Sequence, residues 1–252
     1  MNNKKIITQI GSLPYRDIDE AVEYSLKHDI PFLPELQLRG DSMLEYIKNP
    51  GKLSCLDEFK KHKYNTTKIQ SIGPATLIIS GYNEDEAIKR VYDHISAITD
   101  GLNAKEIILF LDEPGLGQVG FDYEKLWEPL FGSFNVISGV HTCGNMDWDK
   151  LFNSSIDIIS FDASKYDITK YFDYRNDKRI SWGIEKKEDV KDFQEGDLLT
   201  LPCGMGPKMY KIEDCERSLK KLIKISDEMA YETATRKKNI KQKESLALNW
   251  VI

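Results

Sequence analysis

The feature that most constrains this fold is a unit repeated along the whole chain. Each unit has a short apolar run rich in β-branched residues, then a loop, then a stretch with the period of an amphipathic helix. Apolar runs without alternation are typical of parallel strands buried on both faces. Eight runs can be assigned, at Lys5–Ile10, Ile30–Pro34, Lys68–Ile72, Glu106–Leu111, Asn135–Val140, Asp157–Phe161, Arg179–Ile184 and Leu198–Leu201. Helical periods lie at Ile18–His28, Ser42–Lys48, Glu84–Gly101, Tyr123–Phe131, Trp148–Asn153, Ile168–Tyr171, Lys187–Phe193 and Ile212–Met229.

Eight strand–helix units in 252 residues predict an α/β protein with a single (β/α)8 TIM barrel, a fold of typically ~250 residues. A doubly wound open sheet is the alternative, but no Gly-x-Gly-x-x-Gly follows the first run. Asp17 and Asn83 have the character of helix N-caps. We expect the catalytic barrel to span residues 1–230, with a basic and then apolar tail over residues 231–252.

Composition excludes several classes of protein. The chain carries 35 basic and 41 acidic residues, so its net charge of −6 offers no general attraction for nucleic acid. No apolar stretch approaches the roughly 18 residues of a membrane helix, and no signal peptide is evident. Four cysteines without a regular spacing argue against a secreted disulfide scaffold. We therefore expect a cytoplasmic protein without a nucleic-acid or membrane partner.

Three residues at the ends of predicted strands suggest a metal site. His141 and Cys143 are separated by one residue, so both side chains point the same way from an extended strand. Cys203 follows the last apolar run. A lone histidine or cysteine is more often structural, but one histidine and two cysteines together predict zinc. Asp162, on the neighbouring strand, is the first choice for a fourth ligand, and Glu185 is the second.

Polar residues also follow other predicted strands, and in a barrel these ends form the active site. Asp112 and Glu113 form such a pair, which is expected to hold a cation or an amine, although a helix cap or turn is the alternative. Glu35 gives a weaker signal of the same kind, and Ser12 could bind a carboxylate or cap a turn.

Taken together, these segments resemble the C-terminal catalytic barrel of cobalamin-independent methionine synthase. The wider group includes zinc methyltransferases that act with corrinoid proteins, and uroporphyrinogen decarboxylase. The matching segments span the predicted barrel in the family's order, and they are Ile10–Pro14, Glu35 followed by Met43–Tyr46, Gly73–Thr76, Leu111–Pro114, His141–Cys143 and Pro202–Gly204.

The resemblance implies a zinc-dependent methyltransferase that activates a thiol amino acid, with homocysteine converted to methionine. It implies that zinc lowers the pKa of the bound thiol, so that a nucleophilic thiolate exists near neutral pH. It also implies residue roles: His141, Cys143 and Cys203 as zinc ligands, Ile10 and Ser12 at the substrate carboxylate, and Glu35 and Asp112 at its ammonium group.

Three departures from the family pattern bear on the methyl donor. Asp162 stands where the family usually has a glutamate ligand, and Trp182–Glu185 lacks the histidine that serves as an acid in folate-dependent enzymes. The N-terminal half that helps to hold folate has no counterpart in this sequence. A folate nitrogen must be protonated to leave, whereas a corrinoid cobalt leaves without protonation. The departures therefore favour a methylcorrinoid over methyltetrahydrofolate.

Three alternatives remain open. A zinc lyase or hydrolase would need a catalytic general base, for which Glu113 and Glu185 are the candidates. A uroporphyrinogen decarboxylase-like enzyme is less favoured, because only Arg16 and Arg39 are available early in the chain for an acidic substrate. A corrinoid- or thiol-binding accessory protein without catalytic activity is the third.

Overall fold

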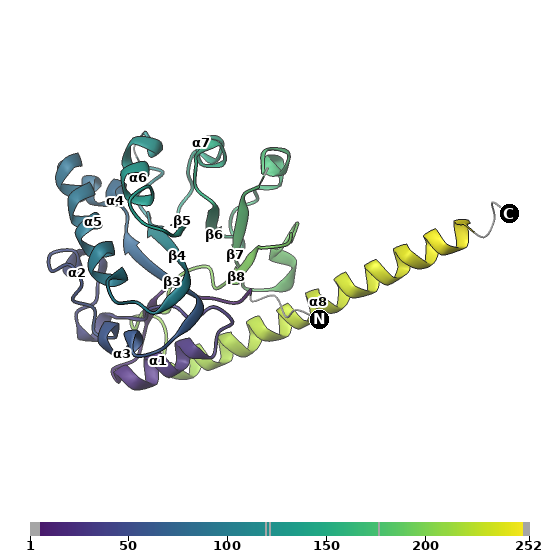
Figure 1. The fold of residues 1–252 in the computed structure, drawn as a ribbon, viewed down its shortest axis with the longest axis horizontal. Coiled ribbons are helices and arrows are strands. Elements are labelled where there is room, and N and C mark those ends of the chain that lie inside the picture. The colour runs from purple at the N-terminus through teal and green to yellow at the C-terminus, as the bar shows by residue number, and fades with distance from the viewer. Residues whose placement is uncertain (1–5, 119, 121, 176, 249–252) are drawn as a thin grey trace.

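The structure, a computed structural model, describes residues 6–118, 120, 122–175 and 177–248, without the side chains of residues 174 and 231–248. Its centre is one curved parallel sheet of six strands in sequential order (Figure 1). The strands are β3 (Tyr64–Ile72), β4 (Ala104–Asp112), β5 (Ile137–Thr142), β6 (Ile158–Asp162), β7 (Arg179–Gly183) and β8 (Leu198–Thr200). A separate parallel pair consists of β1 (Ser12–Leu13) and β2 (Glu35–Leu36).

The predicted closed (β/α)8 barrel is wrong: the six-stranded sheet is a half-barrel, and the β1–β2 pair is a second, smaller sheet. Lys5, where the first predicted strand begins, lies outside the described residues. The described residues of the first two predicted strands make only isolated parallel bridges to the large sheet, from Ile7 to Leu199 and from Phe32 to Lys68. Pro31 and Pro34 flank the second bridge, and proline has no backbone N–H to extend a ladder. Residues 30–34, of which all but the half-buried Pro31 are buried, therefore lie beside β3 without forming a regular strand.

Eight α-helices and three 3₁₀-helices are assigned among the described residues. The α-helices are α1 (Ile18–Leu26), α2 (Met43–Tyr46), α3 (Leu56–Lys60), α4 (Pro74–Ile79), α5 (Glu84–Thr99), α6 (Tyr123–Phe131), α7 (Trp148–Asn153) and α8 (Ile212–Leu248). The 3₁₀-helices are η1 (Gln37–Arg39), η2 (Thr169–Tyr174) and η3 (Lys187–Asp189), and the last two occupy predicted α-helical segments.

Local side-chain chemistry explains where several helices begin and end. The Asp17 carboxylate accepts the Glu20 amide at 3.0 Å, and the Asn83 side chain accepts the Glu86 amide at 2.9 Å, which confirms both predicted N-caps.

Helix α8 continues past residue 230 and extends away from the body (Figure 1). No helix in the described part of the chain is long and apolar enough to cross a membrane.

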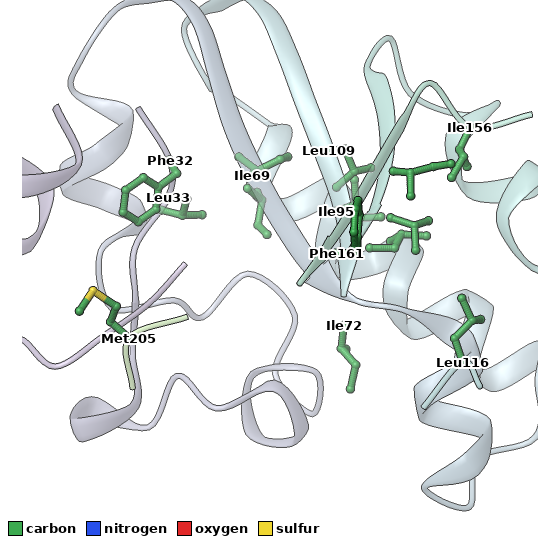
Figure 2. Packing of buried hydrophobic residues seen from close by; sticks show 14 of the residues in the cluster. Phe32, Leu33, Ile69, Ile72, Ile95, Leu109, Leu116, Ile156, Phe161 and Met205 are labelled. Atoms are coloured by element: carbon green, nitrogen blue, oxygen red, sulfur yellow. The ribbon is translucent and has the colours of Figure 1, made fainter. Parts of the chain in front are cut away.

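Strand alternation divides the apolar residues into two clusters. Ile69 and Leu109 are register partners on β3 and β4 that belong, with Ile95 of α5, to the large cluster (Figure 2). The smaller cluster lies on the opposite, inner face of the sheet. It contains the strand residues Ile108, Phe110, Ile158 and Leu198, together with Ile10 and Ile30 from outside the strands. Polar side chains of this inner face, at the carboxyl ends of the strands, form the candidate site.

Candidate metal centre and pocket

The structure brings His141, Cys143 and Cys203 together at the carboxyl ends of β5 and β8. The potential ligand atoms of the three residues all lie within 4.8 Å of one another. His141 Nε2 is 3.2 Å from Cys143 Sγ, and the two cysteine Sγ atoms are 3.5 Å apart. Cys143 and Cys203 thus meet although they are 60 residues apart in sequence.

Neighbouring strands fix this arrangement. His141 is the register partner of Ser160 on β6, and its Nδ1 lies 3.0 Å from Ser160 Oγ, which leaves Nε2 directed at Cys143. A histidine that binds a metal through one nitrogen typically bonds a second group through the other. Gly183 lets the segment before Cys203 pack closely, because a Cβ there would lie 2.8 Å from Pro202 Cα and 2.4 Å from Phe161 O.

The donor set fits zinc. With Zn–S near 2.3 Å and Zn–N near 2.0–2.1 Å, tetrahedral geometry places two sulfurs roughly 3.8 Å apart and a nitrogen and a sulfur roughly 3.6 Å apart. The observed separations of 3.5 and 3.2 Å are slightly shorter than these values. Two cysteines and one histidine are also a known set for catalytic zinc, in which the fourth position stays open for substrate. The cluster therefore needs no fourth protein ligand.

The two thiols have opposed acidities. Hydrogen bonds from Cys143 and His141 lower the pKa of Cys203, whereas the hydrogen bond to Cys203 and burial raise the pKa of Cys143. Two thiols in contact lose their protons one after the other, and neither step can be assigned to one cysteine alone, because the first thiolate opposes formation of the second. A cation bound between them would favour ionisation of both.

Neither predicted fourth ligand belongs to this cluster. The Asp162 carboxylate accepts the Ser164 amide at 3.1 Å and the Ser164 hydroxyl at 2.5 Å, and it pairs with Lys165 at 2.8 Å. Burial opposes ionisation of Asp162, but the bonds from Lys165 and Ser164 prevail and lower its pKa. Glu185 is exposed, and its backbone N–H donates to Asp189 at 2.8 Å.

A pocket of about 330 Å³ adjoins the cluster, a volume at the small end of the roughly 300–1,000 Å³ range of ligand sites. His141, Cys143 and Cys203 line it, together with three of the four predicted substrate-binding residues, which are Ile10, Ser12 and Asp112. Glu35, the fourth, is absent from the lining. The pocket is thus large enough for a small amino acid beside the metal cluster.

Asp112 and Glu35 are buried carboxylates whose oxygens make no well-formed hydrogen bond. Asp112 is 0% and Glu35 is 1% exposed, and none of their four oxygens has a partner of good hydrogen-bond geometry among the described residues, although the Gln70 amide lies close enough to Glu35 to lower its pKa. Burial and the charge of Asp112 raise the pKa of Glu35 to about 8, while burial raises the pKa of Asp112 to about 6. A buried polar group without a partner is costly and rare, so these oxygens call for a bound donor or cation.

Glu113 has a structural role, although it is adjacent to Asp112. Its buried carboxylate accepts the Ala75 amide at 3.0 Å, the Thr76 amide and hydroxyl at 2.7 Å each, and Trp127 Nε1 at 3.2 Å. It therefore caps the N-terminus of α4, where unpaired N–H groups favour a carboxylate. Gly73 makes room for it, because a Cβ there would lie 2.1 Å from Glu113 Cδ.

Lys68 and Gln70 of β3 were not among the predicted site residues. Both are buried on the inner face, and burial lowers the pKa of Lys68 to about 8, opposed by the charges of Asp112 and Glu35. The signal in the sequence is a lysine and a glutamine two positions apart in an apolar run, which puts two polar side chains on one face of a buried strand.

Comparison with known proteins leaves the family open. No family model matches the chain, and no curated protein matches it either. The resemblance to cobalamin-independent methionine synthase therefore stays a hypothesis that rests on the motifs. Five of the six motifs contribute a residue to the pocket lining, namely Ser12, Met43, Asp112, His141 and Cys203.

Proposed function

We propose that this protein is a zinc-dependent methyltransferase that activates a thiol substrate, with homocysteine converted to methionine. The observation that carries the proposal is the cluster of His141, Cys143 and Cys203 beside a pocket whose wall contains the unpartnered carboxylate of Asp112. If the sulfur of an amino-acid thiol were held at the cluster, the amino group of the same molecule would lie in the pocket, near the Asp112 carboxylate.

The roles of the residues follow from their positions. His141, Cys143 and Cys203 would hold the zinc, and Ser160 would keep the imidazole oriented through its 3.0 Å contact with Nδ1. Bound zinc supplies Lewis acidity that lowers the pKa of a substrate thiol. Asp112 would pair with the substrate ammonium, while the raised pKa of the buried Glu35 favours its neutral form. Orientation of the thiol toward a donor methyl is then the main contribution of the chain to the rate.

A methylcorrinoid is the favoured methyl donor, and methyltetrahydrofolate is the less favoured one. Transfer from folate needs an acid at the leaving nitrogen, and His141 is the one histidine among the residues that line the pocket. Since its Nε2 faces Cys143, that histidine is engaged with the cluster. A cytoplasmic location is part of the proposal, because metal-binding thiols persist in a reducing compartment.

The zinc lyase or hydrolase alternative has less support. It requires a free general base near the metal-binding residues, but Glu113 caps α4 and the exposed Glu185 lies outside the pocket lining. Cobalt substitution distinguishes the two reactions. A thiol substrate should add a sulfur-to-cobalt charge-transfer band in a methyltransferase, whereas a hydrolase that uses metal-bound water should show no new band.

The decisive experiment measures zinc and methyl transfer in the same preparations. We expect one zinc per wild-type chain, and methionine formation from homocysteine with methylcobalamin or methyltetrahydrofolate. Cys203→Ser should weaken zinc binding by at least about 100-fold and abolish transfer, because it removes a thiolate ligand. Cys215→Ala is the matched control, since Cys215 is buried on α8 outside the cluster. Wild-type protein that contains no zinc and gains none on incubation would refute the mechanism.

A further inference from the structure

The proposed reaction leaves one buried cation unexplained. Lys68 is fully buried on β3, its Nζ lies 4.8 Å from the centre of the Phe110 ring, and it donates a 2.6 Å hydrogen bond to Gln70 Oε1. An ammonium group is seldom buried unless its interactions serve a purpose, because removing it from water is costly. The charges of Asp112 and Glu35 favour the ammonium form of Lys68, but among the described residues its hydrogen bond goes to Gln70.

The hydrogen bond from Lys68 determines how Gln70 is turned. Lysine nitrogen is only a donor, so the amide oxygen of Gln70 must face it, and the same oxygen accepts the Gly11 amide at 2.7 Å. An amide turned by 180° would place its NH₂ group against two donors. In this orientation Gln70 Nε2 makes no well-formed hydrogen bond among the described residues, but the amide lies close enough to Glu35 to lower the pKa of that carboxyl.

Gly11 connects this pair to the pocket. It lies between Ile10 and Ser12, both of which line the pocket with the metal-binding residues. The fit is close, because a Cβ on Gly11 would lie 2.7 Å from Gln70 Nε2. Any shift of Gln70 would therefore be transmitted directly to the backbone of residues 10–12.

We propose that Lys68 and Gln70 are positioning residues, which hold the Ile10–Ser12 wall of the pocket so that it can bind the carboxylate group of the thiol substrate. The inference rests on the proposed function for the identity of that substrate. Lys68 acts through Gln70, and Gln70 acts through the Gly11 amide. Neither residue needs to contact the reacting sulfur.

The test compares two thiols by calorimetry without a methyl donor, using zinc-loaded full-length protein. Homocysteine has the carboxylate that the wall would bind, whereas 3-aminopropane-1-thiol has the same thiol and amine without it. We expect Lys68→Met to weaken homocysteine binding by about tenfold or more, as for loss of a hydrogen bond that involves a charged group. Binding of 3-aminopropane-1-thiol should not weaken, because no bond to the wall is lost and removal of the Lys68 charge leaves Asp112 more attractive to an ammonium group.

Two further variants control this comparison. Gln70→Leu removes the acceptor without touching the charge, and it should give the same contrast even if Lys68→Met fails to fold. Lys60→Met removes a lysine whose Nζ bonds Ala97 O at 3.0 Å, away from the residues that line the pocket, and it should leave both affinities unchanged. Zinc content should stay at the wild-type value in all three proteins.

The possible outcomes separate this inference from the proposed function. Equal weakening of both thiols, or unchanged homocysteine binding in Gln70→Leu, would overturn the positioning role. Wild-type protein that binds neither thiol would overturn it as well. If the wild type binds homocysteine but transfers no methyl group from either donor, the proposed function fails, and the contrast between the two thiols still decides the role of Lys68 and Gln70.

Discussion

Replacement of Glu113 by glutamine should damage stability more than chemistry. One carboxylate oxygen accepts the Ala75 amide and Trp127 Nε1, and the other accepts the Thr76 amide and hydroxyl. Glutamine has one acceptor oxygen, so its NH₂ group must face one of these two pairs of donors. The least costly orientation faces Thr76, where the hydroxyl can rotate to accept but the backbone N–H loses its partner.

The magnitude follows from that count. One buried N–H without a partner costs about 1–3 kcal/mol, and the remaining bonds lose the added strength of an ionised acceptor. We therefore expect Glu113→Gln to lower the free energy of unfolding by about 2–4 kcal/mol at pH 7.5. The difference should widen as pH falls from 6 to 4.5, because burial raises the pKa of Glu113 from 4.5 to about 6, so the folded wild type takes up a proton that the unfolded chain does not, and the glutamine variant has no such group.

Equilibrium urea unfolding followed by tryptophan fluorescence would measure this change. Glu185→Gln is the control, because the Glu185 side chain is exposed and should tolerate the change within about 0.5 kcal/mol. If Glu113→Gln unfolds like the wild type and yet abolishes methyl transfer, the capping role is refuted and the catalytic role predicted from the sequence gains support.

Two further predictions concern buried carboxylates. The neutral form of Glu35 is favoured in the folded protein, where burial and the charge of Asp112 raise its pKa to about 8 from a value near 4.5. The folded state therefore holds a proton that the unfolded chain loses, so the contribution of Glu35 to stability should be greatest below pH 4.5 and should fall as pH rises toward 8. Glu35→Gln should flatten this dependence of unfolding free energy on pH, measured by urea unfolding at several pH values. An unchanged slope would contradict the assignment. Asp197 pairs with Arg175, which is 2% exposed, and it accepts the Ile180 amide at 2.8 Å and Trp182 Nε1 at 2.9 Å. Asp197→Asn should cost about 3–5 kcal/mol in chemical unfolding, because the buried guanidinium loses its buried counter-charge and keeps only the half-exposed Asp192 at 3.6 Å. A loss below about 1 kcal/mol would be inconsistent with that pairing.

Much of the local structure could be predicted from the sequence. Helix starts at Asp17 and Asn83 depend on a side chain and an amide three residues later, so local sequence contains both partners. The metal cluster was also predictable in part, because one-residue spacing in a strand places His141 and Cys143 on one side. The contribution of Cys203 depended on the assumption that parallel strands end at one edge, which the large sheet satisfies for β5 and β8.

The prediction of a closed barrel was wrong because an apolar stretch of sequence indicates that a segment is buried, but it does not indicate which segment its backbone will hydrogen-bond. Ile7, Ile10, Ile30 and Phe32 are all buried, as the pattern indicated. Their segments nevertheless make isolated bridges in place of ladders. Whether a buried run joins a sheet depends on the register and distance of a neighbour that is remote in sequence, and on prolines that lack the donor.

The adjacent carboxylates Asp112 and Glu113 show what the sequence determines and what only the tertiary structure determines. The sequence by itself determined that two acidic residues would end a buried strand, and that His141, Cys143 and Cys203 would supply soft ligands at strand ends. The tertiary structure alone decided that Asp112 faces the pocket while Glu113 caps α4, because successive side chains of a strand point to opposite sides and only packing fixes which side is which. The same holds for Lys68, whose role depends on Gln70 and on a glycine 57 residues away in the chain.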